Sequence, residues 1–153
     1  MTRPITIQPE RADTPEVRAI LAAGDAYAAE LYPADSNHML DLAALLEPRV
    51  HFLVARVDGV AAATGAVVRY AGYGELKRMF VLPQFRGLGL GRRMLDALLD
   101  HLRSQGITLA RLETGILNRE ACALYERDGF RVIGPFGSYV ADPLSLFYER
   151  DLG

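Results

Sequence analysis

A run of alternating glycines is the first feature of this sequence that predicts chemistry. It follows a strand-like stretch and precedes an apolar stretch with helical spacing. Its backbone N–H groups therefore lie at the start of a helix, where they and the helix dipole attract an anion. Glycine lets a phosphate approach the backbone without meeting a side chain. The pattern predicts a phosphate-binding loop formed by Arg86, Gly87, Leu88, Gly89, Leu90, Gly91 and Arg92.

The two commonest phosphate loops do not fit this run. A dinucleotide-binding loop, G-x-G-x-x-G, needs a glycine where Arg92 or Met94 stands. A P-loop needs G-K-[ST] after the helix-side glycine, and that triplet is absent. The plainer alternative is a glycine-rich turn that only leads into a helix.

A second group of functional side chains follows in the segment from Asn118 to Phe130. Tyr125 lies two helical turns after Asn118, so both side chains point from the same face of the predicted helix. Both side chains could therefore face a bound cofactor. In the alternative interpretation, Asn118 only caps its helix and Tyr125 packs its ring against Phe130 and Leu124.

Hydrophobic spacing predicts the elements that position these groups. It favours helices at 14–31 and, capped by Ser36, at 36–48, with Thr14 as the N-cap of the first before Pro15. Alternation favours strands at 52–57 and 60–70 joined by an Asp58-Gly59 hairpin turn, then a strand at 75–82. A helix that ends at Gly106 and a strand at 107–114 form a crossover unit with parallel strands. The remaining expected elements are a helix at 118–128 and strands at 6–7, 130–133 and 144–149.

Length and composition narrow the class of protein. The 153 residues, 50% of them hydrophobic, suit one domain, residues 1–153, whose core needs no disulfide. A net charge of -2 disfavours nucleic-acid binding. The first ten residues do not resemble a signal peptide, and no apolar run reaches the ~18 residues of a membrane span, so we expect a soluble protein. The single cysteine, Cys122, excludes an intramolecular disulfide and indicates a reducing, cytoplasmic location.

Two motifs together resemble those of the GNAT acetyltransferase superfamily. Val81-Leu82-Pro83 followed by R-x-x-G-x-G, from Arg86 to Gly91, is similar to the family's acyl-coenzyme A loop. The segment from Asn118 to Phe130 is similar to its N-x-x-A-x-x-L-Y-x-x-x-G-F pattern, and the resemblance covers about residues 76–132. It implies a mixed α/β fold, in which a twisted, mostly antiparallel sheet of about seven strands is flanked by four helices.

For the donor, the resemblance implies acetyl-CoA and no metal. The backbone of Met79, Phe80 and Val81 would pair with the pantetheine arm as an added strand, and the amides from Gly87 to Arg92 would hold the pyrophosphate. The alternative is that Met79 and Val81 are simply core strand residues. Arg86 and Arg92 are candidate phosphate contacts or simply solvated, and Asn118 is a candidate cofactor contact.

For catalysis, the resemblance implies that Tyr125 gives a proton to the departing coenzyme A thiolate. A base must also take the ammonium proton, since only a neutral amine attacks the thioester. Glu113 is the first candidate, Glu75 is its rival, and a water chain could replace either. No covalent acyl-enzyme is needed, so Cys122 is expected to be a small buried residue.

The acceptor implied by the resemblance is the primary amine of a small molecule or amino acid. A protein N-terminus or lysine, and a non-catalytic acyl-CoA-binding regulator, are the alternatives. Candidate acceptor-binding residues are Tyr32, His38 and Tyr139, although His38 could simply sit in the first turn of the second helix. His51 and His101 are expected at the surface. The apolar strand at 144–148 is a candidate surface for a homodimer.

Overall fold

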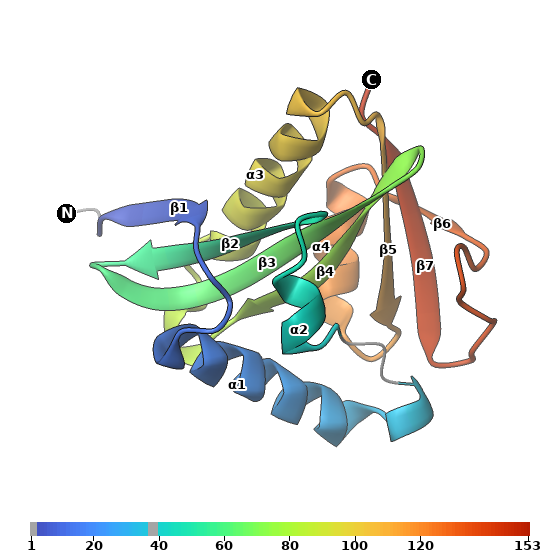
Figure 1. Cartoon of the computed structure of the whole chain (residues 1–153). Coiled ribbons are helices and arrows are strands. Elements are labelled where there is room, and N and C mark those ends of the chain that lie inside the picture. Colours follow the sequence, from blue (N-terminus) through green and yellow to red (C-terminus); the bar gives the residue numbers. More distant parts are fainter. Residues whose placement is uncertain (1–2, 37–39) are drawn as a thin grey trace.

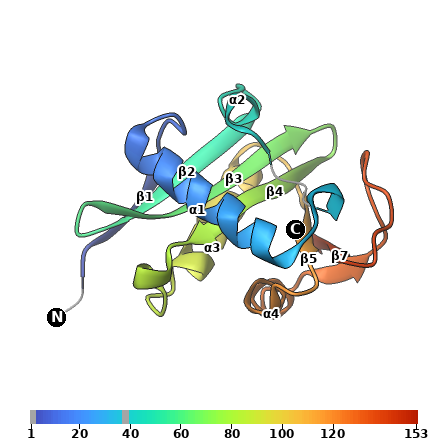
Figure 2. The same ribbon diagram turned by 90° about the horizontal axis from the view of Figure 1, so that it is seen from below.

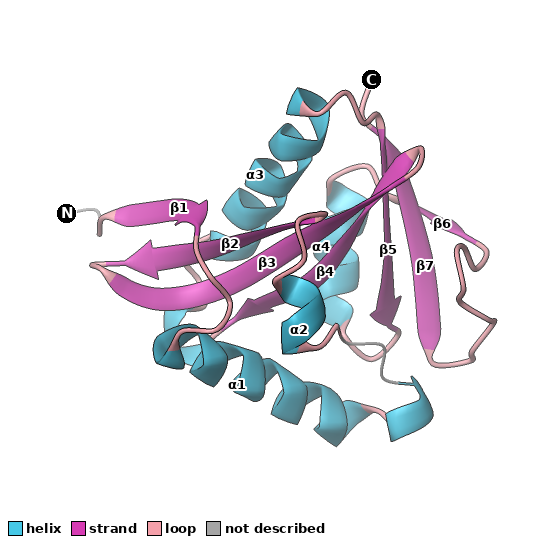
Figure 3. Ribbon diagram, viewed as in Figure 1, coloured by secondary structure: helices cyan, strands magenta, loops and turns pink. Residues whose placement is uncertain are grey.

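The protein is a layered α/β structure in which helices cover both faces of one sheet. The computed structural model describes residues 3–36 and 40–153 (Figures 1 and 3). Its strands are β1 (Ile5–Pro9), β2 (Val50–Val57), β3 (Val60–Tyr70), β4 (Tyr73–Val81), β5 (Leu109–Gly115), β6 (Arg131–Ile133) and β7 (Ser145–Asp151). Its α-helices are α1 (Pro15–Leu31), α2 (Leu42–Leu45), α3 (Leu90–Ser104) and α4 (Arg119–Arg127). The expected fold class is confirmed.

The sheet is mostly antiparallel, with one parallel seam near its middle. Its strand order is β1-β2-β3-β4-β5-β7-β6. The parallel pair is β4 and β5, which α3 connects, so the expected crossover unit is confirmed. Their register joins Gly74 to Ala110, Glu75 to Arg111 and Leu76 to Leu112. Beyond Leu76 the two strands diverge, as Figure 1 shows, and the sheet opens there.

Two hydrophobic cores hold the layers together, one on each face of the sheet. On one face, the leucine-rich side of α3 buries Leu95, Leu98 and Leu102 against the central strands. On the other face, α1 buries Val17 and Ile20 beneath the same strands. Figure 2 shows α1 crossing in front of β2, β3 and β4. The sheet is therefore fixed from both sides at the strands that border its opening.

Local signals in the sequence explain most of the element boundaries. The Thr14 hydroxyl accepts a hydrogen bond from Val17 N–H at 3.4 Å, with Pro15 at the first helical position, as expected. The hairpin turn between β2 and β3 has Asp58 and Gly59 at φ angles of 52° and 79°. Positive φ at both turn residues is the geometry that Asp-Gly favours. The first helix and this hairpin are confirmed.

The second helix is shorter than the sequence predicted. The structure has a 3-10 turn at Ala34–Ser36 and then α2 over Leu42–Leu45, in place of one helix over 36–48. Asp41 is the actual N-cap, because its carboxylate accepts a hydrogen bond from Ala44 N–H at 2.9 Å. The predicted extent of this helix is therefore wrong, and Asp41 rather than Ser36 is its cap. Residues 37–39 lie outside the described part of the chain.

None of the described helices combines the length and apolar character needed to cross a membrane.

Candidate active site

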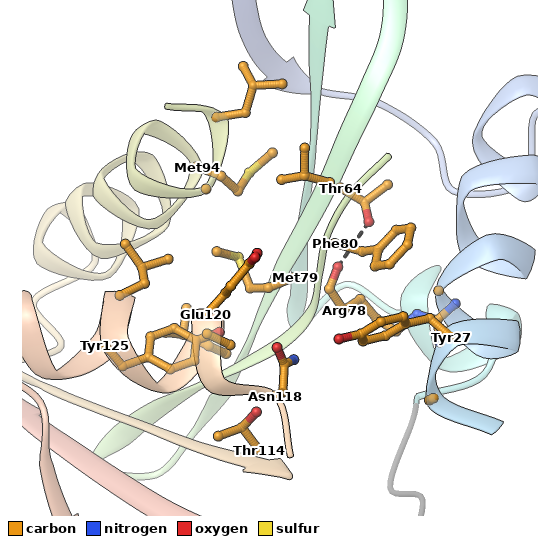
Figure 4. Close-up of a pocket in the computed structure, with 18 of the residues that line it drawn as sticks. Tyr27, Thr64, Arg78, Met79, Phe80, Met94, Thr114, Asn118, Glu120 and Tyr125 are labelled. Atoms are coloured by element: carbon orange, nitrogen blue, oxygen red, sulfur yellow. Dashed lines mark hydrogen bonds between the residues drawn. The ribbon is translucent and has the colours of Figure 1, made fainter. Parts of the chain in front are cut away.

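A cavity of about 640 Å³ lies where β4 and β5 diverge. Its walls come from α1 and the following 3-10 turn, the β4 strand, the glycine loop with the start of α3, the end of β5, and α4. Figure 4 shows Tyr27 of α1, Met79 and Phe80 of β4 and Tyr125 of α4 arranged around a common space. The fold thus collects at one opening residues that are far apart in the sequence.

The glycine loop brings free backbone N–H groups to this cavity. Gly87 and Gly89 have φ angles of 83° and 74°, a left-handed conformation that side chains disfavour. Gly89 is the N-cap of α3, so no side chain satisfies the first helical N–H groups. Arg93 N–H is bonded back to the Gly89 carbonyl at 3.1 Å, which leaves the earlier N–H groups available. The cavity is lined by Gly87, Gly89, Leu90, Gly91 and Arg92, whereas Leu88 packs against the core.

The two arginines beside the loop have different surroundings. The Arg92 guanidinium lies 3.4 Å from the Asp96 carboxylate and 3.2 Å from that of Asp128. The Arg86 guanidinium lies over the rings of Tyr27 and Phe80, 6.0 and 5.9 Å from their centroids. Arg92 therefore already shares its charge with two carboxylates, while Arg86 offers its charge at the cavity rim.

The edge of β4 is open beside the cavity. Leu82 donates its N–H to the Ala62 carbonyl of β3 at 2.9 Å. Because hydrogen-bonding groups alternate sides along a strand, those of Met79 and Val81 face away from β3, toward the cavity. The Val81 carbonyl has one contact, from Arg86 Nε at 3.4 Å. An extended ligand with amide groups can pair with this edge.

Phe80 differs from its two neighbours on β4. It pairs in register with Thr64, so its backbone faces β3, in contrast to the predicted backbone contact with a ligand. Its ring lies on the cavity wall, 6.0 Å from the Tyr27 ring, and packs beside Gly24 of α1. The side chain of Phe80, rather than its backbone, is what a ligand in the cavity would meet.

A β-bulge on β4 lies just beyond Leu76, where β4 and β5 separate. Thr64 pairs with Phe80 and Ala66 with Lys77, so Gly65 stands opposite two residues, Arg78 and Met79. A bulge bends its strand and increases the local twist. The Thr64 hydroxyl donates to the Arg78 carbonyl at 2.9 Å and fixes the bulge on its β3 side (Figure 4).

Asn118 and Tyr125 both line the cavity from α4. Asn118 occupies the N-cap position, but its side chain does not cap the helix and forms no hydrogen bond with any described residue. Tyr125 is 5% exposed, and its ring packs against Phe130 at 5.7 Å, as the alternative interpretation expected. Burial raises the pKa of Tyr125, so its hydroxyl stays protonated at neutral pH. Tyr125 therefore both packs its ring against Phe130 and lines the cavity.

The two candidate carboxylates occupy different environments. Glu113 lines the cavity, and its Oε2 accepts a hydrogen bond from Ser145 Oγ at 2.8 Å. Glu75 is 3% exposed and does not line the cavity. Its Oε2 accepts a hydrogen bond from the Tyr139 hydroxyl at 2.5 Å and lies 3.2 Å from Lys77 Nζ. Of these two candidates, Glu113 is therefore the one that a ligand in the cavity can reach, and Glu120 of α4 also lines the cavity (Figure 4).

Of the predicted acceptor-binding residues, Tyr32 lines the cavity and Tyr139 does not. Tyr32 lines the cavity, and its hydroxyl accepts the Leu117 N–H at 3.0 Å. The Tyr32 hydroxyl lies so close to Gly115 that a Cβ there would be 1.9 Å away, so any side chain at this position would force the Tyr32 ring to move. Tyr139 does not line the cavity, because its hydroxyl is tied to Glu75 and Lys77. His38 lies outside the described residues.

Three further residues differ from what the sequence suggested. His51 and His101, expected at the surface, are partly buried and stack with parallel rings 3.5 Å apart. Burial lowers the pKa of both imidazoles, and for His51 the neighbouring His101 adds to the effect. Cys122, expected to be buried, is half-buried, and burial raises the pKa of its thiol.

Sequence reasoning missed several residues that line the cavity, among them Tyr27, Lys77, Arg78 and Glu120. Lys77 and Arg78 are consecutive charges inside an apolar strand, which breaks the alternation expected of a regular strand. That break was a readable signal for the bulge. Tyr27 has no comparable signal, because an aromatic residue on an amphipathic helix most often belongs to a core.

Comparison with known sequences agrees with this geometry. A family model described as "Acetyltransferase (GNAT) family" matches residues 16–130. A protein of Azospirillum brasilense named IAA acetyltransferase is 48% identical over 130 residues, which span 84% of this chain and 85% of that protein.

Comparison with solved structures gives the same result. A crystal structure assigned to an acyl-CoA N-acyltransferase of Klebsiella pneumoniae superposes with a TM-score of 0.86 at 37% identity, over 97% of this chain and 98% of the other. The PaiA N-acetyltransferase of Thermoplasma acidophilum, solved in complex with coenzyme A, superposes with a TM-score of 0.75 over 97% and 99% of the two chains. At 16% identity, this second likeness shows the fold alone.

Proposed function

The chain belongs to the acetyltransferase (GNAT) family, and from this premise we propose that it transfers the acetyl group of acetyl-CoA to a primary amine of a small molecule. The observation that carries the proposal is the opening between β4 and β5, where an unpaired strand edge and uncapped helix N–H groups line one cavity. The name of the Azospirillum brasilense relative supports a small-molecule acceptor.

The residues at the opening fit the parts of acetyl-CoA, which supplies the activated thioester. The N–H groups from Gly87 to Arg92 would hold the pyrophosphate, with Arg86 at the rim. The edge groups of Met79 and Val81 would pair with the amides of the pantetheine arm. Asn118 brings an amide that has no partner among the described residues.

The reaction needs one group that accepts a proton from the amine and one that gives a proton to the leaving thiolate. Glu113, directly or through a water, would accept the proton that the acceptor ammonium must lose before its nitrogen attacks. Tyr125 would give its proton to the thiolate of coenzyme A as that sulfur leaves. Burial raises the pKa of Tyr125, so the hydroxyl carries its proton at neutral pH, as a proton donor must. Tyr32 would form part of the acceptor wall.

The test is a calorimetric titration with acetyl-CoA, followed by an assay of thiol release with a panel of amines, amino acids and peptides. We expect micromolar binding and thiol release with small amines. We expect Glu113→Gln to lower turnover by about tenfold or more with unchanged acetyl-CoA affinity. Absence of binding at millimolar acetyl-CoA would refute the proposal, and release with peptides alone would favour a protein acceptor.

A further inference from the structure

Arg78 stands at the bulge of β4 in an unusual conformation. Its φ angle is 57°, in the left-handed region that a non-glycine residue adopts at an energetic cost. The residue is 9% exposed, although arginine is seldom buried without partners. Such a conformation persists only where the surrounding structure holds it. The contacts of Arg78 with neighbouring elements must therefore stabilise the bulge.

The side chain of Arg78 connects the bulge to α1. Its Nη1 lies 2.6 Å from Oδ1 of Asp25, and its Nη2 donates to the Leu21 carbonyl at 3.1 Å. The guanidinium side chain is 4% exposed, whereas that of Asp25 is 59% exposed. The carbonyl of Arg78 accepts the Thr64 hydroxyl from the opposite side. The bulge is thus held by β3 through the backbone and by α1 through the guanidinium.

This double attachment has a geometric consequence for the open edge. Met79 follows the bulge directly, and Val81 follows two residues later, so the position of the bulge sets where their backbone groups point. An apolar side chain could fill the same volume, but it could not bond to both Asp25 and the Leu21 carbonyl. The guanidinium instead supplies directional hydrogen bonds between two elements.

We infer that Arg78 is a positioning residue that clamps the β4 bulge to α1 and so holds the Met79–Val81 edge where the pantetheine arm pairs with it. This inference rests on the proposed function, because it assigns that edge to acetyl-CoA. The guanidinium of Arg78 bonds to Asp25 and to the Leu21 carbonyl, which both belong to α1 and not to the glycine loop. Its loss should weaken the grip on the arm and leave the grip on the pyrophosphate intact.

The test uses Arg78→Gly and Asp25→Ala in the full chain. Glycine accepts a φ of 57° without strain, so Arg78→Gly permits the bulge conformation while it removes the whole side chain, guanidinium included. Asp25→Ala changes a mostly exposed residue and is expected to fold even if the first variant does not. The matched control is Asp100→Ala, which removes the exposed carboxylate of another arginine pair, with Arg103 at 3.0 Å.

Two ligands distinguish binding of the pantetheine arm from binding of the pyrophosphate. Acetyl-CoA should bind about tenfold more weakly to Arg78→Gly and to Asp25→Ala, the loss expected for a hydrogen-bonded charged pair. A coenzyme A fragment that keeps the pyrophosphate and nucleotide but lacks the pantetheine arm should bind all variants equally. In turnover assays, KM for acetyl-CoA should rise more than kcat falls, and Asp25→Glu, which keeps the carboxylate, should restore part of the affinity.

The outcomes distinguish the inference from the proposed function. If the wild-type protein does not bind acetyl-CoA, the proposed function fails. If it binds acetyl-CoA and both variants bind it with wild-type affinity, Arg78 has no positioning role. If both variants lose the fragment and acetyl-CoA equally, the effect is a general loss of structure, and the inference is also overturned.

Discussion

The two ends of the cavity are built in different ways. At the end formed by the glycine loop and the β4 edge, the groups offered to a ligand are mainly backbone N–H and C=O groups, fixed by one helix start and one bulge. At the other end they are side chains such as Tyr32 and Glu113, brought together from α1 and β5.

This difference explains why one end of the cavity has a recognisable sequence pattern and the other end does not. A backbone site depends on glycines at fixed spacing, so its pattern is visible in the sequence. A side-chain site depends on which segments the fold brings together, so its residues need no common pattern. We therefore expect substitutions at the first end to abolish donor binding, and those at the second to alter turnover with particular acceptors.

The largest effect is expected from Gly89→Val, which damages the backbone end alone. A branched side chain at a φ of 74° is strained and covers the helix N–H groups. We expect acetyl-CoA affinity to fall by about a hundredfold or more, since several charge-assisted hydrogen bonds are lost. Calorimetric titration measures the affinity.

Gly106→Val is the matched control for this loop variant. Gly106 also has a φ of 74°, and neither glycine has an atom within 4 Å of an added Cβ. Both variants should lose similar stability, but Gly106→Val should bind acetyl-CoA normally. Equal loss of binding in both would show that the loop has no special part in it.

Tyr125→Phe should have the next largest effect, on the reaction rather than on binding. Removal of the hydroxyl should lower turnover by about ten- to a thousandfold, the range of general-acid catalysis, with acetyl-CoA affinity nearly unchanged. Tyr148→Phe is the control, because Tyr148 is fully buried near Tyr125 and donates its hydroxyl to Glu126 at 2.6 Å. Unchanged turnover in Tyr125→Phe would remove that residue from the mechanism.

Smaller effects are expected at the N-cap residues Thr14 and Asn118, and they should differ in kind. Thr14 caps α1 through its hydroxyl, so Thr14→Ala should lower the free energy of unfolding by about 1 kcal/mol and leave acetyl-CoA binding intact. The Asn118 side chain caps nothing, so Asn118→Ala should keep stability and weaken acetyl-CoA binding a few fold. Urea unfolding and calorimetry measure the two quantities. The opposite pattern would make Asn118 a structural residue.

The smallest effect concerns the stacked His51 and His101, which lie outside both ends. Folding lowers the pKa of each imidazole below its usual value of 6.5, so the unfolded chain binds protons more tightly. Stability should therefore be complete above about pH 6.5 and decline below it. Thermal unfolding between pH 5 and about 7 should show a fall of a few degrees, which His51→Gln should reduce. Acetyl-CoA affinity should not follow this change.

Much of the fold was predictable because its signals are local. The Thr14-Pro15 helix start, the Asp58-Gly59 turn and the strand–helix–strand crossover each depend on neighbouring residues. The prediction of the second helix was wrong because two residues that favour the N-cap position, Ser36 and Asp41, lie close together, and the local sequence does not decide between them.

Part of the site was predictable from sequence motifs. The glycine loop, Asn118 and Tyr125 meet at one cavity, as their motifs indicated. The different surroundings of Glu75 and Glu113 could not be predicted, because the tie between Glu75 and Tyr139 joins residues far apart in the sequence. Arg78 was missed because its partner is on α1, and only the three-dimensional structure brings Asp25 to it.

The short seam between β4 and β5 has a mechanical consequence. Three residue pairs join these strands within the described chain, so a short parallel pairing connects the β1–β4 part of the sheet to the β5–β7 part. A ligand bound in the cavity would contact residues of both parts and limit their relative motion. Amide protons of Gly74–Leu76 should therefore exchange with solvent more slowly once acetyl-CoA is bound, even though none of these residues belongs to the loop.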